Sequence, residues 1–209
     1  LASIEMIEAV GHRRLDRFFH QCGELLRPEG TCVLQAIVMP DRGFDRYLKS
    51  VDFIQRYVFP GGCLPSMGSM LQSVARSTDL RFVHAEDFAP HYAETLRRWR
   101  TAFHEHLDGV RAMGFSERFI RLWNYYLCYC EAAFEERATG VVQIQFDKPE
   151  CRRDPLQIGA RAACEPDFAV AANDAYRQQS QSAGSNTASR PSAGFAKTVL
   201  AACKNGVDR

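Results

Sequence analysis

The fold of this chain is decided by one stretch, Cys32-Val33-Leu34-Gln35-Ala36-Ile37-Val38-Met39. A nearly unbroken apolar run is typical of a strand covered on both faces of a parallel sheet. Before it, residues 13–26 place apolar side chains on one helix face, and residues 27–30 form a turn. The mostly apolar residues 3–10 indicate the end of an earlier strand. Strand, helix and strand in this order form a βαβ unit, so the sequence predicts an α/β fold.

Further elements are expected downstream. Residues 52–57 predict a short helix, and Ser66 predicts the cap of a helix that begins at Met67. The remaining predictions are a short strand over 80–84, two long amphipathic helices over 92–107 and 119–134, and a last strand over 142–146. In that last strand apolar and polar residues alternate, which indicates a half-buried strand near a sheet edge.

The two ends of the chain differ in character. The first strand has no earlier strand to pair with, so we expect an N-terminal half of the domain upstream of Leu1. Residues 178–192 are rich in Ser, Gln, Ala and Asn and contain no aromatic residue, which leaves too little apolar surface to fold. We therefore predict a truncated α/β domain over residues 1–150 and a mostly disordered tail over residues 151–209.

Composition narrows the classes of function. Lys and Arg (26) nearly balance Asp and Glu (25), so no net field draws the chain to nucleic acid. No apolar stretch is long enough to span a bilayer, so we expect any membrane contact to be peripheral. The eight cysteines are scattered, as in a protein of a reducing cytoplasm, and Cys128 and Cys130 lack a Cys/His pair at zinc spacing. We expect no metal site.

Motif absences are also informative. The sequence contains no Gly-x-Gly-x-x-Gly, no P-loop and no Glu/Asp-x-Gly-x-Gly turn, so it has no phosphate or adenosyl cradle of its own. Gly-x-Ser-x-Gly and His-Glu-x-x-His are missing too, and we interpret the cluster His104-Glu105-His106 as a solvated helix face.

Spaced motifs give the chain a family resemblance. They are Glu5-Met6-Ile7-Glu8-Ala9-Val10-Gly11, Leu34-Gln35-Ala36-Ile37, Asp52-Phe53-Ile54-Gln55, Phe59-Pro60-Gly61-Gly62-Cys63-Leu64-Pro65-Ser66 and His91-Tyr92-Ala93-Glu94-Thr95-Leu96. In this order they resemble the cyclopropane-fatty-acyl-phospholipid synthases and mycolic acid cyclopropane synthases over residues 4–149. The resemblance implies the C-terminal portion of an S-adenosylmethionine (SAM)-dependent methyltransferase, with a Rossmann-like sheet truncated at its N-terminus.

The resemblance also implies an activity. The family adds the SAM methyl carbon to a cis double bond of a phospholipid acyl chain. A bound bicarbonate is thought to take a proton from the resulting cation, and some members form a methyl branch instead of a ring. Water must be excluded because it would capture the cation. The implied cofactors are SAM, whose main binding loop is absent from this chain, and bicarbonate. The implied partners are unsaturated phospholipids at a membrane surface, and the sequence leaves homo-oligomers open.

The family's bicarbonate site maps onto four residues of this sequence. Glu8 matches the carboxylate that holds bicarbonate, Tyr92 matches a tyrosine that completes the site, and Ile37 matches a position that contributes its backbone. Gln35 stands where many members have histidine, so it can donate a hydrogen bond but carries no positive charge. Without the resemblance, Glu8 would be interpreted as a solvated or helix-capping residue and Tyr92 as a core aromatic.

Other matching residues are candidates for catalysis or for the acyl pocket. Cys130 matches a cysteine often regarded as the active-site residue of the family, although a helix-face cysteine is usually buried packing. Acyl-pocket candidates are the aromatic residues Phe53, Tyr57, Phe59, Trp99, Trp123 and Tyr126.

Two alternatives to a lipid methyltransferase fragment stay open: a lipid-binding fragment without catalysis, and a methyltransferase for another hydrophobic substrate, since pocket shape sets specificity.

Overall fold

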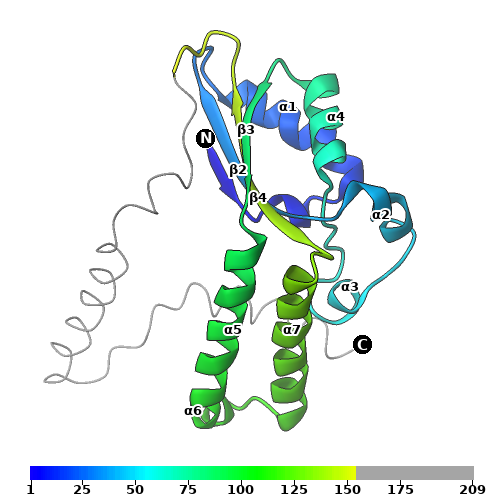
Figure 1. Ribbon diagram of the computed structural model, residues 1–209, viewed down its shortest axis with the longest axis vertical. Helices are drawn as coiled ribbons and strands as arrows, with labels where there is room; N and C mark the ends of the chain where they lie inside the picture. The colour runs from blue at the N-terminus through cyan, green and yellow to red at the C-terminus, as the bar shows by residue number, and fades with distance from the viewer. Residues whose placement is uncertain (154–209) are drawn as a thin grey trace, which may run out of the picture. The chain divides into compact units, whose positions relative to one another are not determined.

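The structure, a computed structural model, describes residues 1–153. The centre is a four-stranded sheet in the order β1-β2-β4-β3 (Figure 1). Its strands are β1 (Ala2–Ile4), β2 (Thr31–Val38), β3 (Arg81–Asp87) and β4 (Gly140–Asp147). β1 is parallel to β2, whereas β4 is antiparallel to both β2 and β3. The prediction of a disordered tail falls almost wholly on residues 154–209, outside the described residues.

One face of the sheet carries the larger apolar core. Helices α1 (Leu15–Leu25) and α4 (Met67–Ser77) pack together against this face. Alternate residues of β2 point into it and are buried, as are their cross-strand partners on β4. The largest fully buried side chains of this core are Phe19, Phe146, Leu34, Ile144, Met70 and Ile7. Burial of such side chains contributes roughly 1.5–3 kcal/mol each relative to exposure.

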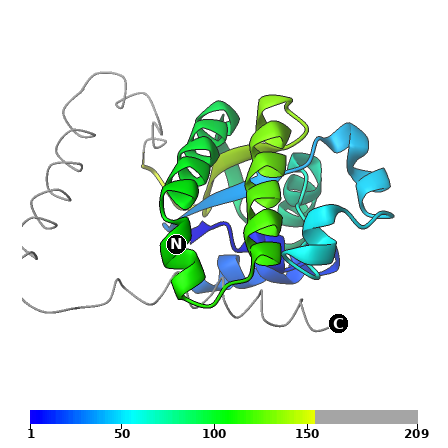
Figure 2. The ribbon, with the colours of Figure 1, turned by 90° about the horizontal axis from the view of Figure 1, so that it is seen from below.

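A pair of long helices extends from the end of the sheet. Helices α5 (Ala89–Glu105) and α7 (Glu117–Glu135) lie side by side, joined by the short α6 (Leu107–Ala112) (Figures 1 and 2). Their facing sides, with Ile37 and Val141 of the sheet, form a second apolar cluster. Glu131 of α7, nearly buried, accepts hydrogen bonds from Arg97 and Arg100 of α5 at 3.0 Å each. The helix pair thus lies at the lower end of the sheet in Figure 1, where Ile37 and Val141 pack against it.

A polar framework shapes the loop between β2 and α4. This loop contains α2 (Asp41–Tyr47) and α3 (Phe53–Tyr57), and Asp52 caps α3 in a capping box with Gln55. The hydroxyl of Tyr47 accepts hydrogen bonds from the Leu64 amide (3.0 Å) and the Gln55 side chain (3.3 Å). Burial raises the pKa of Tyr47 to about 12, so the phenol stays neutral and holds the loop in place.

Most predicted elements are confirmed, but three details are wrong. β4 is not an edge strand: it lies between β2 and β3, and its alternating Gln143 and Gln145 lie on the face opposite the larger apolar core. The strand expected over residues 3–10 ends at Ile4, because Glu5 takes a left-handed backbone (φ 51°) and a 3₁₀ turn, η1 (Ile7–Ala9), follows. Residues 41–47 form α2, a helix that the sequence did not predict.

Within residues 1–153, no helix combines the length and apolar character needed to cross a bilayer, and no cluster of three potential metal ligands occurs.

Candidate active site

The candidate site lies where the parallel strands β1 and β2 end. In α/β sheets ligands bind at the carboxyl ends of strands. Glu5 follows β1 directly, and its amide still donates to the Gln35 carbonyl at 2.9 Å. Its left-handed backbone is unusual for a residue with a side chain and is a form of strain that concentrates at functional sites. The turn ends the strand pairing and brings the half-buried Glu5 carboxylate beside β2.

Two donors from distant elements hold the Glu5 carboxylate. The Tyr92 hydroxyl of α5 donates to Oε2 at 2.8 Å, and Nε2 of Gln35 on β2 donates to Oε1 at 2.8 Å. Gln35 is bound in turn by Nε2 of Gln143 on β4, which donates to Oε1 of Gln35 at 2.8 Å. The Glu5 carboxylate is therefore held by residues of α5 and β2, and the β2 residue is itself hydrogen-bonded to β4.

Glu8 places a second carboxyl group next to the first. Because β1 has already ended, the Ile37 amide of β2 lacks a strand partner there and donates to Oε1 of Glu8 at 2.6 Å. The other oxygen, Oε2, is buried and has no hydrogen-bond partner among the described residues. Burial raises the pKa of Glu8, and the negative charge of Glu5 adds to this, while the hydrogen bond from Ile37 acts in the opposite direction. Glu8 therefore holds a proton more readily than an exposed glutamate.

Tyr92 is a hydrogen-bond donor over the whole physiological range. Burial raises the pKa of its hydroxyl, and the charge of Glu5 and the hydrogen bond to it raise it further. The site therefore contains two neighbouring carboxyl groups. Glu8 has a raised pKa, and Glu5 accepts hydrogen bonds from two neutral donors.

The four residues expected to hold bicarbonate do come together, but around protein carboxylates. Gln35 and Tyr92 donate to Glu5, and the Ile37 backbone donates to Glu8. Glu5 and Gln143 have no role in the sequence-based prediction. The available signals were a glutamate at the end of a strand and a glutamine opposite Gln35 in an apolar strand, but their pairing across 30 and 108 residues is visible only in the fold.

Cys130, the third predicted catalytic residue, has a thiol that stays protonated at neutral pH. It packs against the second apolar cluster from α7, and burial raises the pKa of its thiol to about 12, despite a hydrogen bond with Tyr126 that lowers it. A thiol in this state is not a ready nucleophile or base at neutral pH.

The acyl-pocket candidates divide into two groups. Trp123 and Tyr126 pack against the second apolar cluster, as Tyr92 does, and their rings are tilted with centroids 4.8 Å apart. Phe53 packs on the tyrosines of α7 at 4.7 Å from the Tyr125 ring, while Tyr57, Phe59 and Trp99 are 48%, 40% and 48% exposed. Phe59 links the groups through Tyr126, with ring centroids 6.1 Å apart. Aromatic side chains therefore run from the surface at α3 to the polar site.

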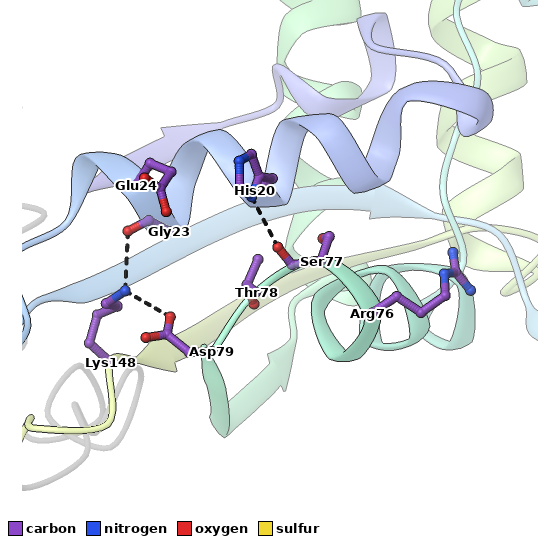
Figure 3. A pocket seen from close by; sticks show the side chains of 8 residues that line it. All are labelled: His20, Gly23, Glu24, Arg76, Ser77, Thr78, Asp79 and Lys148. Carbon is purple, nitrogen blue, oxygen red and sulfur yellow. Dashed lines mark hydrogen bonds and ion pairs between the residues drawn. The ribbon is translucent and has the colours of Figure 1, made fainter.

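A separate groove of about 430 Å³ lies between α1 and the end of α4 (Figure 3). Its lining residues are His20, Gly23, Glu24, Arg76, Ser77, Thr78, Asp79 and Lys148. Lys148 donates to Asp79 at 2.7 Å and to the Gly23 carbonyl at 3.4 Å, so its ammonium group is already used within the fold. This groove is on the α1 and α4 side of the sheet, whereas Gln35 and Gln143 face the other side.

Comparison with known proteins points to one family. The profile of the family described as mycolic acid cyclopropane synthetase matches residues 1–144. The chain is 43% identical to tuberculostearic acid methyltransferase UfaA1 of Mycobacterium tuberculosis, over 68% of this chain and 34% of that protein. It is 33% identical to the cyclopropane-fatty-acyl-phospholipid synthase of Escherichia coli, over 71% of this chain and 37% of that protein. The chain thus spans about a third of the length of these relatives.

Solved structures agree with this match. The cyclopropane synthase MmaA2 of Mycobacterium tuberculosis superposes with a TM-score of 0.63 and 28% identity, over 70% of this chain and 54% of that chain. The mycolic acid cyclopropane synthase CmaA1, complexed with S-adenosylhomocysteine (SAH) and the detergent CTAB, gives 0.63 and 29% over the same shares. The truncated Rossmann-like methyltransferase fold expected from the sequence is confirmed.

Proposed function

Since the chain belongs to the mycolic acid cyclopropane synthetase family, we propose that it forms the proton-accepting part of a SAM-dependent methyltransferase acting on unsaturated lipid acyl chains. The observation that carries this proposal is the Glu5 carboxylate, held at 2.8 Å by both Tyr92 and Gln35 beside Glu8. The names of the relatives, a lipid methyltransferase and a cyclopropane synthase, support the same substrate class.

The chemistry of the reaction requires a base. When a methyl group adds to a double bond, the neighbouring carbon becomes a cation, and a C–H bond must break to discharge it. The electron pair of that bond closes a ring or forms a new double bond, and the proton passes to the base. We assign the base to Glu5, because the hydrogen bonds from Tyr92 and Gln35 fix the direction of its carboxylate.

The methyl donor is held mainly by other residues. When bound, SAM supplies the methyl group. The turn after β1 in this chain contains Glu5 and Glu8 rather than a glycine-rich cradle, so these residues do not fit an adenosyl group by themselves. What this chain contributes is the base, the neutral donors around it and the aromatic side chains that keep water from the reacting carbons.

Bicarbonate is the alternative base implied by the resemblance. In this chain Gln35 and Tyr92, which would hold bicarbonate, already donate to Glu5, and a further anion beside the Glu5 carboxylate would be repelled. We infer that the Glu5 carboxylate takes the place of bicarbonate. The reaction should then proceed in bicarbonate-free buffer.

The finer aspects of the proposal concern the lipid and the product. We propose a phospholipid acyl chain met at the cytoplasmic membrane surface, supported by the exposed aromatic side chains of α3 and the following loop. A methyl-branched product competes with a cyclopropane, because the 43% identical relative is named for methyl transfer to a fatty acid.

The experiment uses this chain and a chimera in which it replaces the matching C-terminal portion of the Mycobacterium tuberculosis relative. Both are incubated with SAM labelled in its methyl group and with vesicles of oleoyl phosphatidylglycerol and phosphatidylcholine, and fatty acids are then analysed by mass spectrometry. The chimera should label the acyl chains, and Glu5→Gln should lose at least roughly a hundredfold in turnover. Vesicle binding without labelling by the folded chimera would instead indicate a lipid-binding fragment. Unchanged turnover in Glu5→Gln would remove Glu5 as the base.

A further inference from the structure

The hydrogen bonds behind Glu5 have a fixed direction. A carboxylate can only accept hydrogen bonds, so Gln35 must present its NH₂ group to Glu5. The carbonyl oxygen of the same amide then points to β4, where it needs a donor. Nε2 of Gln143 supplies that donor at 2.8 Å. A reversed Gln35 amide would place its oxygen 2.8 Å from the Glu5 carboxylate, oxygen against oxygen.

Sheet register makes this arrangement reproducible. Gln35 and Gln143 are directly opposite each other in the antiparallel pair of β2 and β4, so both side chains lie on the same face. Both are half-buried, which limits the water that could replace either partner. Gln143 itself makes no hydrogen bond with Glu5 or Tyr92 in the described part of the chain, so any effect on the base passes through Gln35.

We propose that Gln143 is a positioning residue of this site, which locks the Gln35 amide with its NH₂ group toward the Glu5 carboxylate. This inference rests on the proposed function for its catalytic consequence, but the hydrogen-bond order itself is a property of the folded chain. Without Gln143, the Gln35 amide is free to rotate and Glu5 keeps Tyr92 as its lasting donor. With a carboxylate at position 143, the Gln35 NH₂ group is drawn to β4 instead.

The first test is NMR on the intact chain, which needs neither cofactor nor lipid. Hydrogen exchange of the Gln35 side-chain NH₂ is measured in the original chain, in Gln143→Met and in the isosteric Gln143→Glu. The exchange should be about tenfold faster in Gln143→Met, the factor that a net hydrogen bond of about 1.4 kcal/mol protects. Gln145→Met is the matched control, because Gln145 lies on the same face of β4 and donates to Asp147 at 3.0 Å. It should leave Gln35 exchange unchanged. Unchanged Gln35 exchange in both folded Gln143 variants would overturn the proposal.

The second test separates positioning from general stability. In the active chimera, Gln143→Met should lower turnover by about tenfold, the loss expected for about 1.4 kcal/mol, with the KM for lipid unchanged. In a Gln35→Met background the same change should have no further effect, because Gln143 acts through Gln35. Additive losses would overturn the proposal. Full turnover in Glu5→Gln would refute the proposed base but leave the NMR result standing, so the two failures are distinguishable.

Discussion

Tyr92 contacts the proposed base, Glu5, through a single hydrogen bond from its hydroxyl. Removing this hydroxyl therefore tests whether the hydrogen bond matters for turnover. Tyr92→Phe removes the donor 2.8 Å from Glu5 and keeps the ring that packs against Phe134. We expect turnover of the chimera to fall roughly tenfold, the effect of one hydrogen bond to a charged group, with the KM for SAM unchanged. Tyr125→Phe, on the exposed side of α7, is the control. Equal turnover in both variants would contradict the assignment.

Glu8 predicts a dependence of stability on pH. Its pKa is raised in the folded state, mainly by burial, so folding favours the protonated form. The cost of the buried charge is absent below the unfolded pKa and grows as pH rises toward and past the folded pKa. Glu8→Gln keeps an acceptor for the Ile37 amide without the charge, so it should raise the melting temperature at pH 7.5 and leave it unchanged near pH 4. Scanning calorimetry at both pH values measures this, and a lower melting temperature at pH 7.5 would refute it.

Some residues of the candidate site were predicted from the sequence, and others were not. Glu8, Gln35, Ile37 and Tyr92 were predicted as a group and do lie together. Glu5 was passed over because nothing local marks a glutamate at a strand end as an acceptor of hydrogen bonds. Its two donors come from residues far along the chain, so only the folded sheet and helix α5 reveal its surroundings.

At the scale of elements, the packing of α5 on α7 depends on one nearly buried carboxylate. Glu131, with 10% of its side chain exposed, accepts from Arg97 and Arg100. Glu131→Ala removes the acceptor shared by Arg97 and Arg100 and should lower the free energy of unfolding by roughly 1.5–3 kcal/mol, the range for a hydrogen bond to a charged group. Chemical denaturation measures the loss. The exposed pair Arg111 and Glu117 is the control, since Glu117→Ala removes a solvent-screened charge and should cost little stability. Similar losses in both variants would show that Glu131 acts as an ordinary surface charge.

Hydrophobic spacing along the sequence predicts single helices and strands, whereas it does not predict which strands pair in the sheet. The helix over 13–26 and the strand over 32–39 follow from hydrophobic spacing and are confirmed as α1 and β2. The placement of β4 was wrong because an alternating pattern usually means one wet face, whereas here Gln143 hydrogen-bonds Gln35 across the sheet. Helix α2 was not predicted because Pro40 and Gly43 favour a turn, and the hydrogen bond from the Gly68 amide to Asp41, which ties α2 to α4, is visible only in the fold.

For the molecule as a whole, we propose that the cofactor is held mainly by residues other than those of this chain. The chain alone should bind SAM weakly, because it lacks a glycine-rich turn for the adenosyl group. Titration calorimetry of the chain and of the chimera compares the two. Binding only in the chimera is the expected result, and micromolar binding by the chain alone would contradict this proposal.

The central claim is that Glu5 replaces a bound anion as the base, and chemical rescue of Glu5→Gly tests it most directly. Glycine suits the left-handed backbone at this position and frees the donors of Tyr92 and Gln35 for an anion from solution. Methyl transfer to vesicle lipids is measured in the chimera with and without bicarbonate. We expect the turnover of the parent chimera to be independent of bicarbonate, and the Glu5→Gly variant to be inactive without bicarbonate and partly restored by it. A parent chimera that requires bicarbonate, or a Glu5→Gly variant that is fully active without it, would contradict the claim.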